Sequence, residues 1–210
     1  MKTFPFQYEA GKPILIYPEG SETKGGDVLE IGPGRGDLLL DLAEAMPAAR
    51  LVAIEIGKRR YYRLIPRIEK RGLSNIQLIG GDARIVLTNH FSQGAFDKIY
   101  VLFPDPWPKK RHAYRRLLNT EFIELLTRFL TVDGDLFMAT DVDWYAEWAA
   151  NNAESLPQLE NMGNPYVDAS ELFSYTPTYF EQKWRADGRS IYYMRFRRLE
   201  HAGPSSTDPR

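Results

Sequence analysis

The sequence predicts a single-domain α/β fold, with a Rossmann-like, doubly wound and mostly parallel sheet that ends in a C-terminal antiparallel hairpin. The first observation behind this prediction is that short apolar runs alternate with stretches of helical periodicity along most of the chain. Such alternation is typical of a parallel sheet with helices on both faces. The second observation is the length, because 210 residues suffice for one such domain and are few for two. The third is a hairpin-type turn signal near the end, Asp187-Gly188.

Apolar runs of strand length define the expected sheet. In chain order they are Val28–Ile31, Leu51–Ile56, Ile76–Ile79, Lys98–Phe103 and Leu136–Thr140. The clearest helical stretch between them is Thr120–Leu130, with Thr120 as the expected N-cap. Near the end, Tyr179–Trp184 and Ile191–Phe196 flank the turn signal, so we expect them to form the antiparallel pair.

The expected α/β core, residues 28–199, is flanked by two segments of different character. Residues 1–27 are rich in Gly and Pro and are expected to form an irregular arm, and residues 200–210 a flexible tail. The first residues lack the apolar stretch of a signal peptide, and no apolar run is long enough to span a bilayer. The absence of cysteine fits a reducing compartment. We therefore expect a cytoplasmic protein that does not contact a membrane.

Charge is unevenly distributed along the chain. A net charge of −1 argues against a protein that simply coats nucleic acid. Residues 109–116 nevertheless contain five cations and no acid, and residues 58–71 contain seven cations against Glu69 alone. Such runs are often solvated surface, and this alternative stays open for both.

A carboxylate stands at or near the end of every expected parallel strand. The five are Glu30, Glu55, Asp82, Asp105 and Asp141. Ligands of doubly wound sheets bind beyond the carboxyl ends of the strands. A single acid there is unremarkable as a turn or cap residue, but five in register predict a site at one crevice.

A glycine-rich loop follows the first expected strand. Gly32, Gly34 and Gly36 have the spacing G-x-G-x-G, which lacks the last glycine of a dinucleotide fingerprint. Glu30, just before the loop, would repel a pyrophosphate and attract an ammonium group. S-adenosylmethionine carries an ammonium group and no phosphate, so we expect it as the cofactor.

Two further acids suit the nucleoside part of that cofactor. Glu55 ends the second strand, where an acid can accept hydrogen bonds from both ribose hydroxyls. Asp82 follows the third strand, where it can accept from the adenine amino group. The alternative is a Rossmann core with incidental acids.

The fourth strand runs into a proline-rich loop, Phe103-Pro104-Asp105-Pro106-Trp107, which continues into the basic run. The prolines stiffen this loop and fix Asp105 and Trp107 at the mouth of the crevice. At this point the sequence resembles the bacterial tRNA (guanine-N7)-methyltransferase family, from about Val28 to Phe196. The loop with its basic run is the most specific shared element. The resemblance also rests on Leu29-Glu30-Ile31-Gly32, Ile54-Glu55, Asp82-Ala83, Ala139-Thr140-Asp141, Tyr145, Thr178, Phe180 and Glu181.

The resemblance implies roles for individual residues. The cofactor, S-adenosylmethionine with its product S-adenosylhomocysteine, would lie against Glu30, Gly32, Gly34, Glu55, Asp82, Ala83 and Asp105. The substrate would contact Lys109, Asp141, Thr178, Tyr179, Phe180 and Glu181. The tRNA would be bound by Arg111, His112, Arg115 and Arg116. Asp105 is the implied catalytic residue, and no obligate protein partner is implied.

Methylation at guanine N7 needs no proton abstraction, because N7 has an in-plane lone pair. Positioning is the main requirement, together with a carboxylate beside the base as positive charge develops on it. Asp105 and Asp141 are both candidates for that carboxylate, and Trp107 either stacks on the base or wedges the loop. No metal is expected, because the three histidines, His90, His112 and His201, lie far apart in the sequence.

Three other functions fit the sequence less well. Methyltransferases of exocyclic amines have two prolines between the acid and the aromatic residue of the corresponding loop, whereas one separates Asp105 from Trp107. A dehydrogenase is disfavoured by the glycine spacing and by Glu30. A non-catalytic RNA-binding adapter with a methyltransferase fold is disfavoured because all the cofactor acids are present.

Overall fold

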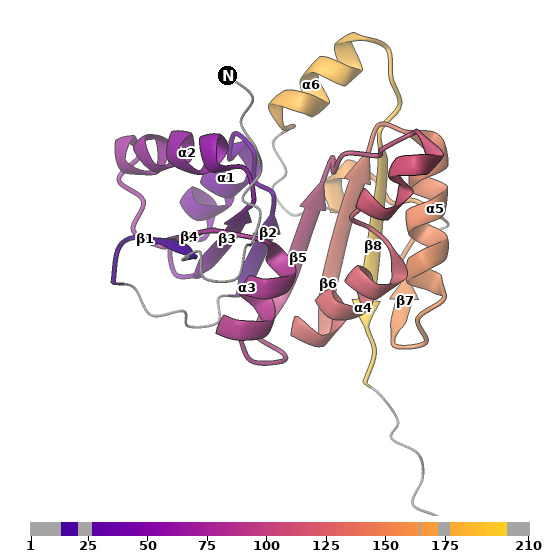
Figure 1. The fold of residues 1–210 in the computed structure, drawn as a ribbon, viewed down its shortest axis with the longest axis horizontal. Coiled ribbons are helices and arrows are strands. Elements are labelled where there is room, and N and C mark those ends of the chain that lie inside the picture. Colours follow the sequence, from indigo (N-terminus) through magenta and orange to yellow (C-terminus); the bar gives the residue numbers. More distant parts are fainter. Residues whose placement is uncertain (1–13, 21–26, 164, 172–176, 201–210) are drawn as a thin grey trace, which may run out of the picture.

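A computed structural model describes residues 14–20, 27–163, 165–171 and 177–200. These residues form one sheet with the strand order β1-β4-β3-β2-β5-β6-β8-β7. Helices cover both faces of the sheet (Figure 1). The strands are β1 (Leu15–Tyr17), β2 (Val28–Ile31), β3 (Leu51–Glu55), β4 (Ile76–Gly80), β5 (Phe96–Leu102), β6 (Leu130–Thr140), β7 (Leu159–Asn161) and β8 (Tyr192–Arg198). The helices are α1 (Asp37–Ala45), α2 (Lys58–Lys70), α3 (Ala83–His90), α4 (Thr120–Phe129), α5 (Asp143–Glu154) and α6 (Tyr179–Ala186), with 3-10 turns η1 (Lys110–Arg115) and η2 (Ala169–Glu171).

The five central strands run parallel, as the sequence predicts, in the order β4-β3-β2-β5-β6. The chain proceeds from β2 outward through β3 and β4, then returns to the other side of β2 with β5 and β6. The strand order therefore reverses between β2 and β5. In doubly wound sheets a ligand binds outside the carboxyl ends of the strands at this point.

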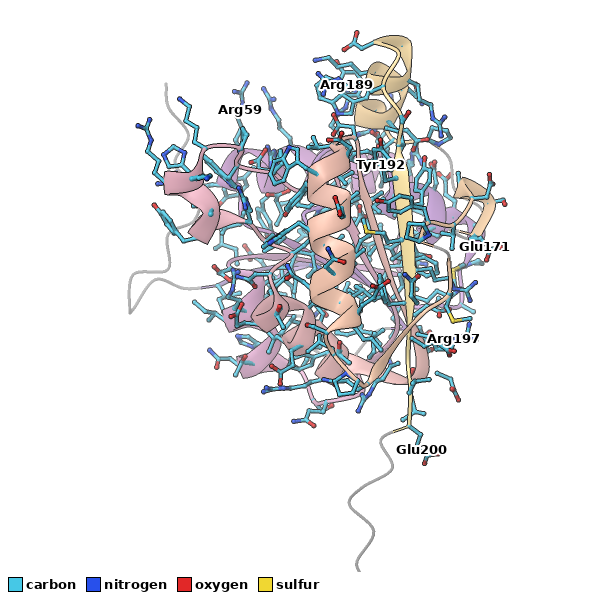
Figure 2. All side chains as sticks on the ribbon, turned by 90° about the vertical axis from the view of Figure 1, so that its right-hand side faces the viewer. Arg59, Glu171, Arg189, Tyr192, Arg197 and Glu200 are labelled. Atoms are coloured by element: carbon cyan, nitrogen blue, oxygen red, sulfur yellow. The ribbon has the colours of Figure 1, made fainter. Side chains whose placement is uncertain are left out.

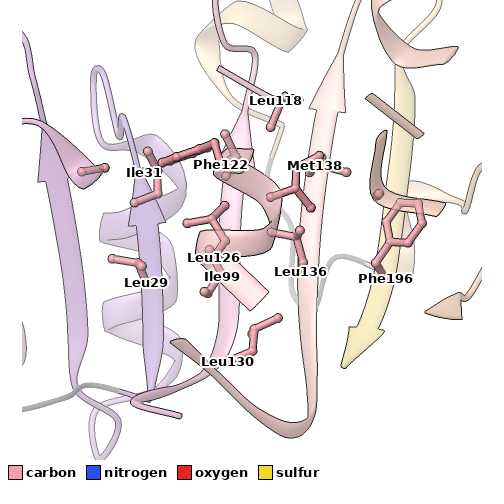
Figure 3. Packing of buried hydrophobic residues seen from close by; sticks show 14 of the residues in the cluster. Leu29, Ile31, Ile99, Leu118, Phe122, Leu126, Leu130, Leu136, Met138 and Phe196 are labelled. Atoms are coloured by element: carbon pink, nitrogen blue, oxygen red, sulfur yellow. The ribbon is translucent and has the colours of Figure 1, made fainter. Parts of the chain in front are cut away.

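Two apolar layers hold the helices on the sheet. On one face α4 packs Phe122 and Leu126 against Leu29, Leu136 and neighbouring strand residues, all buried (Figure 3). On the other face α1 and α2 bury the residues Leu38, Leu39, Leu42, Leu64 and Ile68. Burying these side chains is the main force that keeps the strand ends, and hence the site, in place.

The sheet ends in antiparallel strands, as the sequence predicts, but the assignment of one of the two expected strands is wrong. The segment Tyr179–Trp184 is not a strand, because it begins α6, in which the Thr178 hydroxyl accepts a hydrogen bond from the Glu181 backbone amide at 3.3 Å. The sheet does end in antiparallel strands, but β8 pairs with β6 on one side and β7 on the other. The pattern Thr-x-x-Glu at Thr178 is a helix-start signal, and it outweighs the aromatic residues that suggested a strand.

The arm expected to be irregular contains a strand. Leu15–Tyr17 forms β1, which pairs antiparallel with β4, with Leu15 opposite Gly80. Of the expected arm, residues 1–27, the structure describes only residues 14–20 and 27. Of the expected tail, residues 200–210, it describes only Glu200. None of the described helices is both long and apolar enough to cross a membrane.

Gly36 joins the glycine-rich loop to α1 and is required by packing as well as by conformation. Its φ is +76°, and an added Cβ would overlap Leu64 Cδ1 of α2. We expect Gly36→Ala to lower the free energy of unfolding by about 2–5 kcal/mol, the sum of left-handed backbone strain and overpacking. Denaturant unfolding measures this loss.

Gly72 provides a matched control for that substitution. Its φ is +63°, but an added Cβ would meet no atom within 4 Å. Gly72→Ala should therefore cost only the backbone strain, about 1–2 kcal/mol. Equal losses in the two variants would show that contact with Leu64 is unimportant.

Candidate active site

Five carboxylates stand at one edge of the sheet. Glu30 and Glu55 belong to β2 and β3, and Asp82, Asp105 and Asp141 follow β4, β5 and β6. These five strands are adjacent and parallel, so their carboxyl ends meet at the same edge. The common edge predicted from the sequence is thus confirmed, although the five side chains differ in burial and partners.

Glu55 clamps the glycine-rich loop to the turn after β3. One carboxylate oxygen accepts from the Gly34 amide at 3.1 Å, and the other accepts from the Gly57 amide at 2.6 Å. The side chain is fully buried, and burial raises the pKa of Glu55 even though these amides and Arg60 favour its charged form. Each oxygen keeps a lone pair, so Glu55 can hold the loop and still accept from a ribose hydroxyl.

Glu30 is the acid with the most unusual surroundings. It is only 4% exposed, and burial raises its pKa to about 8, helped by the nearby charges of Glu55 and Asp37. A backbone hydrogen bond from Leu39 in the first turn of α1 favours the charged form. Its atom Oε2 has no hydrogen-bond partner among the described residues. A buried carboxyl oxygen without a partner is costly, and a hydrogen-bonding group of a ligand would satisfy it.

The glycine-rich loop leaves room beside Glu30 for a ligand to approach the backbone. Gly32 has a φ of +70°, and no atom lies within 4 Å of the position that a Cβ would take. At Gly34 the nearest atom to that position is the Gly32 carbonyl oxygen, 3.8 Å away. The open loop and the Glu30 Oε2 atom, which has no partner among the described residues, together fit a phosphate-free nucleoside that carries an ammonium group, as S-adenosylmethionine does.

Asp82 has one oxygen engaged at the start of α3. Its Oδ1 accepts from the Arg84 amide at 2.8 Å and so caps the helix. The residue is half-buried, and Ala83 behind it is buried. The structure thus gives Asp82 a capping role at the site edge, which leaves its second oxygen for the predicted contact with adenine.

The loop that carries Asp105 is held in an unusual backbone conformation. Phe103 and Trp107, on either side of Asp105, have positive φ values of 51° and 45°. Non-glycine residues adopt such values only where surrounding contacts enforce them. Asp105 itself is exposed, beyond the carboxyl end of β5, where the strand order reverses.

Arg116 supplies such contacts on the Trp107 side of the loop. Its Nε donates to the Pro106 carbonyl at 3.2 Å, and its Nη2 donates to the Trp107 carbonyl at 3.3 Å. The guanidinium carbon lies 4.7 Å from the ring centre of Trp144 and 5.5 Å from that of Trp148. The sequence predicts that Arg116 binds RNA. In the structure, two N–H groups of its guanidinium donate to loop carbonyls, and the guanidinium lies over tryptophan rings of the same protein.

We expect Arg116→Lys to lower kcat about 10- to 100-fold, because lysine keeps the charge but cannot reproduce the planar two-donor contact that positions the loop. The salt dependence of tRNA binding should not change. Steady-state kinetics at saturating tRNA, with binding titrations at several salt concentrations, measures both.

Arg115 is the matched control, since it is exposed and its guanidinium lies 4.9 Å from the ring centre of Trp107 without bonding the loop carbonyls. Arg115→Gln should lower the slope of log K against log salt by roughly 0.7–0.9. A normal kcat for Arg116→Lys would contradict the positioning role.

The rest of the predicted RNA-binding run lies on η1 and just before it. Lys109 and Arg111 are exposed, as is Arg115, whereas His112 is half-buried with its ring edge-on to Trp107 at 5.6 Å. Trp107 therefore lies between His112 and Arg115. Of the two predicted roles of Trp107, these contacts favour packing within the loop over stacking on the base.

Asp141 and α6 meet at the same edge. Asp141 forms an ion pair with Arg189, whose guanidinium lies 4.0 Å from the ring centre of Trp184. At the other end of α6, the Tyr179 amide donates to Asp37 at 3.0 Å, and Arg35 lies 4.1 Å from the Tyr179 ring centre. Figure 1 shows α6 above the carboxyl ends of the strands. Contacts near both ends of α6 thus hold it over the crevice, to Asp37 on one side and through Arg189 to Asp141 on the other.

The predicted substrate residues of α6 have mixed surroundings. Thr178 caps the helix, and Glu181 is fully buried, with hydrogen bonds from Arg185 at 2.8 Å and from the Tyr193 hydroxyl. Tyr179 is 45% exposed. The Phe180 side chain lies outside the described residues. The structure brings this segment to the site, but the Glu181 carboxylate points into the protein, toward Arg185 and Tyr193.

Sequence reasoning missed three residues that organise the site, namely Arg35, Asp37 and Arg189. Asp37 accepts from Tyr179 of α6 and pairs with Arg67 of α2 at 3.2 Å. An acid at the first position of a helix after a glycine-rich loop was the available signal. Arg189 had no such signal, because only the fold brings it to Asp141. No group of three or more potential metal ligands occurs within the described part of the chain.

The fold and this edge define the class, a Rossmann-like methyltransferase that uses S-adenosylmethionine. Residues 24–194 match a family model described as "Putative methyltransferase". The fold is similar to that of a SAM-dependent methyltransferase from Aquifex aeolicus, with a TM-score of 0.58 and 13% identity over 84% of each chain.

Curated relatives identify the family. A tRNA (guanine-N(7)-)-methyltransferase of Nitrosomonas eutropha is 36% identical over 165 residues, which are 78% of this chain and 72% of the relative. A second, from Alkalilimnicola ehrlichii, is 34% identical over 176 residues, 84% of this chain and 74% of the relative. The chain belongs to the tRNA (guanine-N(7)-)-methyltransferase family.

Proposed function

We propose that this protein transfers the methyl group of S-adenosylmethionine to N7 of a guanine in tRNA, in the cytoplasm. The observation that carries the proposal is the carboxylate edge at the switch point. It combines a buried acid, one oxygen of which has no partner among the described residues, and an open glycine loop with an exposed acid on a stiff loop. Family membership supports the same substrate and reaction.

The cofactor residues bind and orient rather than react. Glu30 supplies a carboxylate for the ammonium group, Glu55 accepts from the ribose, and Asp82 with Ala83 borders the adenine. When bound, S-adenosylmethionine supplies the methyl as an electrophile, and the N7 lone pair forms the new bond while the sulfur keeps the electrons of the old one. No base is needed, since no proton leaves guanine during the transfer.

The substrate residues place the base and stabilise its charge. Positive charge develops on guanine during transfer, and a fixed carboxylate nearby lowers the barrier. Asp141 is already paired with Arg189, whereas no cation among the described residues pairs with Asp105. Asp105 is therefore the acid that offers an uncompensated negative charge to the base. Lys109, Asp141 and the start of α6 would hold the base and its ribose.

The test is to incubate the protein with labelled S-adenosylmethionine and unmodified tRNA. Borohydride and aniline then cleave the RNA at 7-methylguanosine, so labelled tRNA should be cut at one guanine. Label on another base, on protein or on a small molecule would overturn the substrate assignment.

An RNA-binding adapter remains the competing function. It predicts tRNA binding without cofactor binding. Isothermal titration with S-adenosylhomocysteine separates the two, because the enzyme must bind this product and the adapter need not.

A further inference from the structure

A basic hollow lies between the glycine-rich loop and α2, away from the predicted RNA-binding run. It has a volume of about 450 Å³ and is lined by Gly34, Arg35, Arg60, Arg63, Leu64 and Arg67. Four of these six residues are arginines from two different elements. The sequence shows the excess of cations in α2, but not that the fold joins Arg35 to them.

The positive charge of the hollow is only half compensated. Arg67 pairs with Asp37 at 3.2 Å, and Arg60 is 3.9 Å from Glu55. No ion pair joins Arg35 or Arg63 to any residue that the structure describes. Two guanidinium groups therefore retain their charge in a concave surface, where the field is focused. Planar guanidinium groups bind phosphate, like carboxylate, through two parallel hydrogen bonds, and phosphate is the anion that an RNA backbone supplies.

The hollow lies next to the predicted substrate segment. Arg35 contacts the Tyr179 ring of α6, and Asp37 bonds both Arg67 and the Tyr179 amide. Any RNA whose base reaches the crevice beneath α6 must continue its backbone past one side of that helix. Figure 2 places Arg59, from the first turn of α2, at the same end of the molecule as Arg189 and opposite Arg197 and Glu200.

We propose that this hollow binds a backbone phosphate of the RNA close to the target guanine, with Arg35 and Arg63 as the ligating groups. It forms a second RNA contact on the side of the crevice opposite the Lys109–Arg116 run. The two basic surfaces bind the RNA backbone on either side of the methylated base. The inference rests on the proposed function, because it takes RNA as the substrate.

The test uses the full chain and Arg63→Gln, since Arg63 has no described partner whose loss would disturb the fold. The affinity for unmodified tRNA is measured across a series of salt concentrations. We expect the slope of log K against log salt to fall by roughly 0.7–0.9 and the affinity at moderate salt to fall about threefold. Arg63→Glu should weaken binding further. Affinity for S-adenosylhomocysteine should not change in either variant.

Arg50→Gln is the matched control. Arg50 is also an exposed arginine, but it directly precedes β3 and so lies at the amino edge of the sheet. Its replacement should leave the slope as in the natural protein. If Arg63→Gln behaves like Arg50→Gln, α2 is only a solvated face and the inference is wrong. A loss of cofactor binding in Arg63→Gln would also overturn it, because the hollow would then serve the cofactor.

These outcomes are separable from failure of the proposed function. If the natural protein neither binds nor methylates tRNA, the function itself fails. If it methylates guanine N7 and Arg115→Gln lowers the salt slope while Arg63→Gln does not, the function stands and only the second contact is refuted.

Discussion

Asp105→Asn is expected to lower kcat for tRNA methylation about 100- to 1,000-fold, the usual loss when one preorganised charge-stabilising group is removed. Asparagine keeps the size of the side chain and one acceptor oxygen, but it removes the negative charge that opposes the charge developing on guanine. Affinity for tRNA should change much less, because the basic surfaces supply most of it. Single-turnover methylation with saturating tRNA and cofactor measures the chemical step directly.

Two comparisons make this prediction specific. Asp133→Asn is the control, since Asp133 lies near the amino end of β6 with a positive φ of 63° that asparagine tolerates. It should leave kcat as it is. Asp141→Asn should act mainly on KM, because Asp141 is neutralised by Arg189 in the free protein. If Asp141→Asn lost more kcat than Asp105→Asn, the two roles would have to be exchanged.

Glu30→Gln is expected to change both the pH dependence of stability and the protons exchanged on cofactor binding. The pKa of Glu30 is raised from 4.5 to about 8 in the folded chain, so the folded state holds a proton that the unfolded state releases. Stability from this group is therefore full below pH 4.5 and is lost as pH rises through about 8. The loss has a slope of about 1.4 kcal/mol per pH unit in this window, and Glu30→Gln should abolish it. Thermal or denaturant unfolding at several pH values tests this.

Cofactor binding should reveal the same proton. An ammonium group favours the charged form of Glu30, so binding near pH 7 should release up to about one proton. Titrations of S-adenosylhomocysteine in buffers with different ionisation enthalpies count the protons. Glu30→Gln should bind more weakly and release none from this position. Equal proton release by the natural protein and the variant would mean that Glu30 only supports the loop.

Local sequence patterns predicted the central sheet and its edge. Apolar runs of strand length, separated by helical stretches, are enough to predict that the strands run parallel, because each helix returns the chain to the same end of the sheet. The acids at the strand ends then share that edge whatever the details of packing. The glycine spacing was similarly informative, since Gly32, Gly34 and Gly36 all adopt positive φ values.

The weaker predictions concerned segments whose structure depends on distant partners. Tyr179–Trp184 looked like a strand because aromatic residues favour strands, yet a helix cap at Thr178 and bonds to Asp37 fix it as α6. Leu15–Tyr17 pairs with β4 although it lies in a Gly- and Pro-rich segment that is expected to be irregular.

By itself, the sequence determined the central parallel strands, the row of carboxylates and the stiff loop around Asp105, because each depends on residues close together in the chain. Only the tertiary structure decided how these groups are used. It buried Glu30 with no partner for Oε2 in the part of the chain that the structure describes, turned Arg116 toward the loop carbonyls, paired Asp141 with Arg189 and joined Arg35 to α2. Burial and pairing depend on which distant segments meet, and no local pattern encodes that.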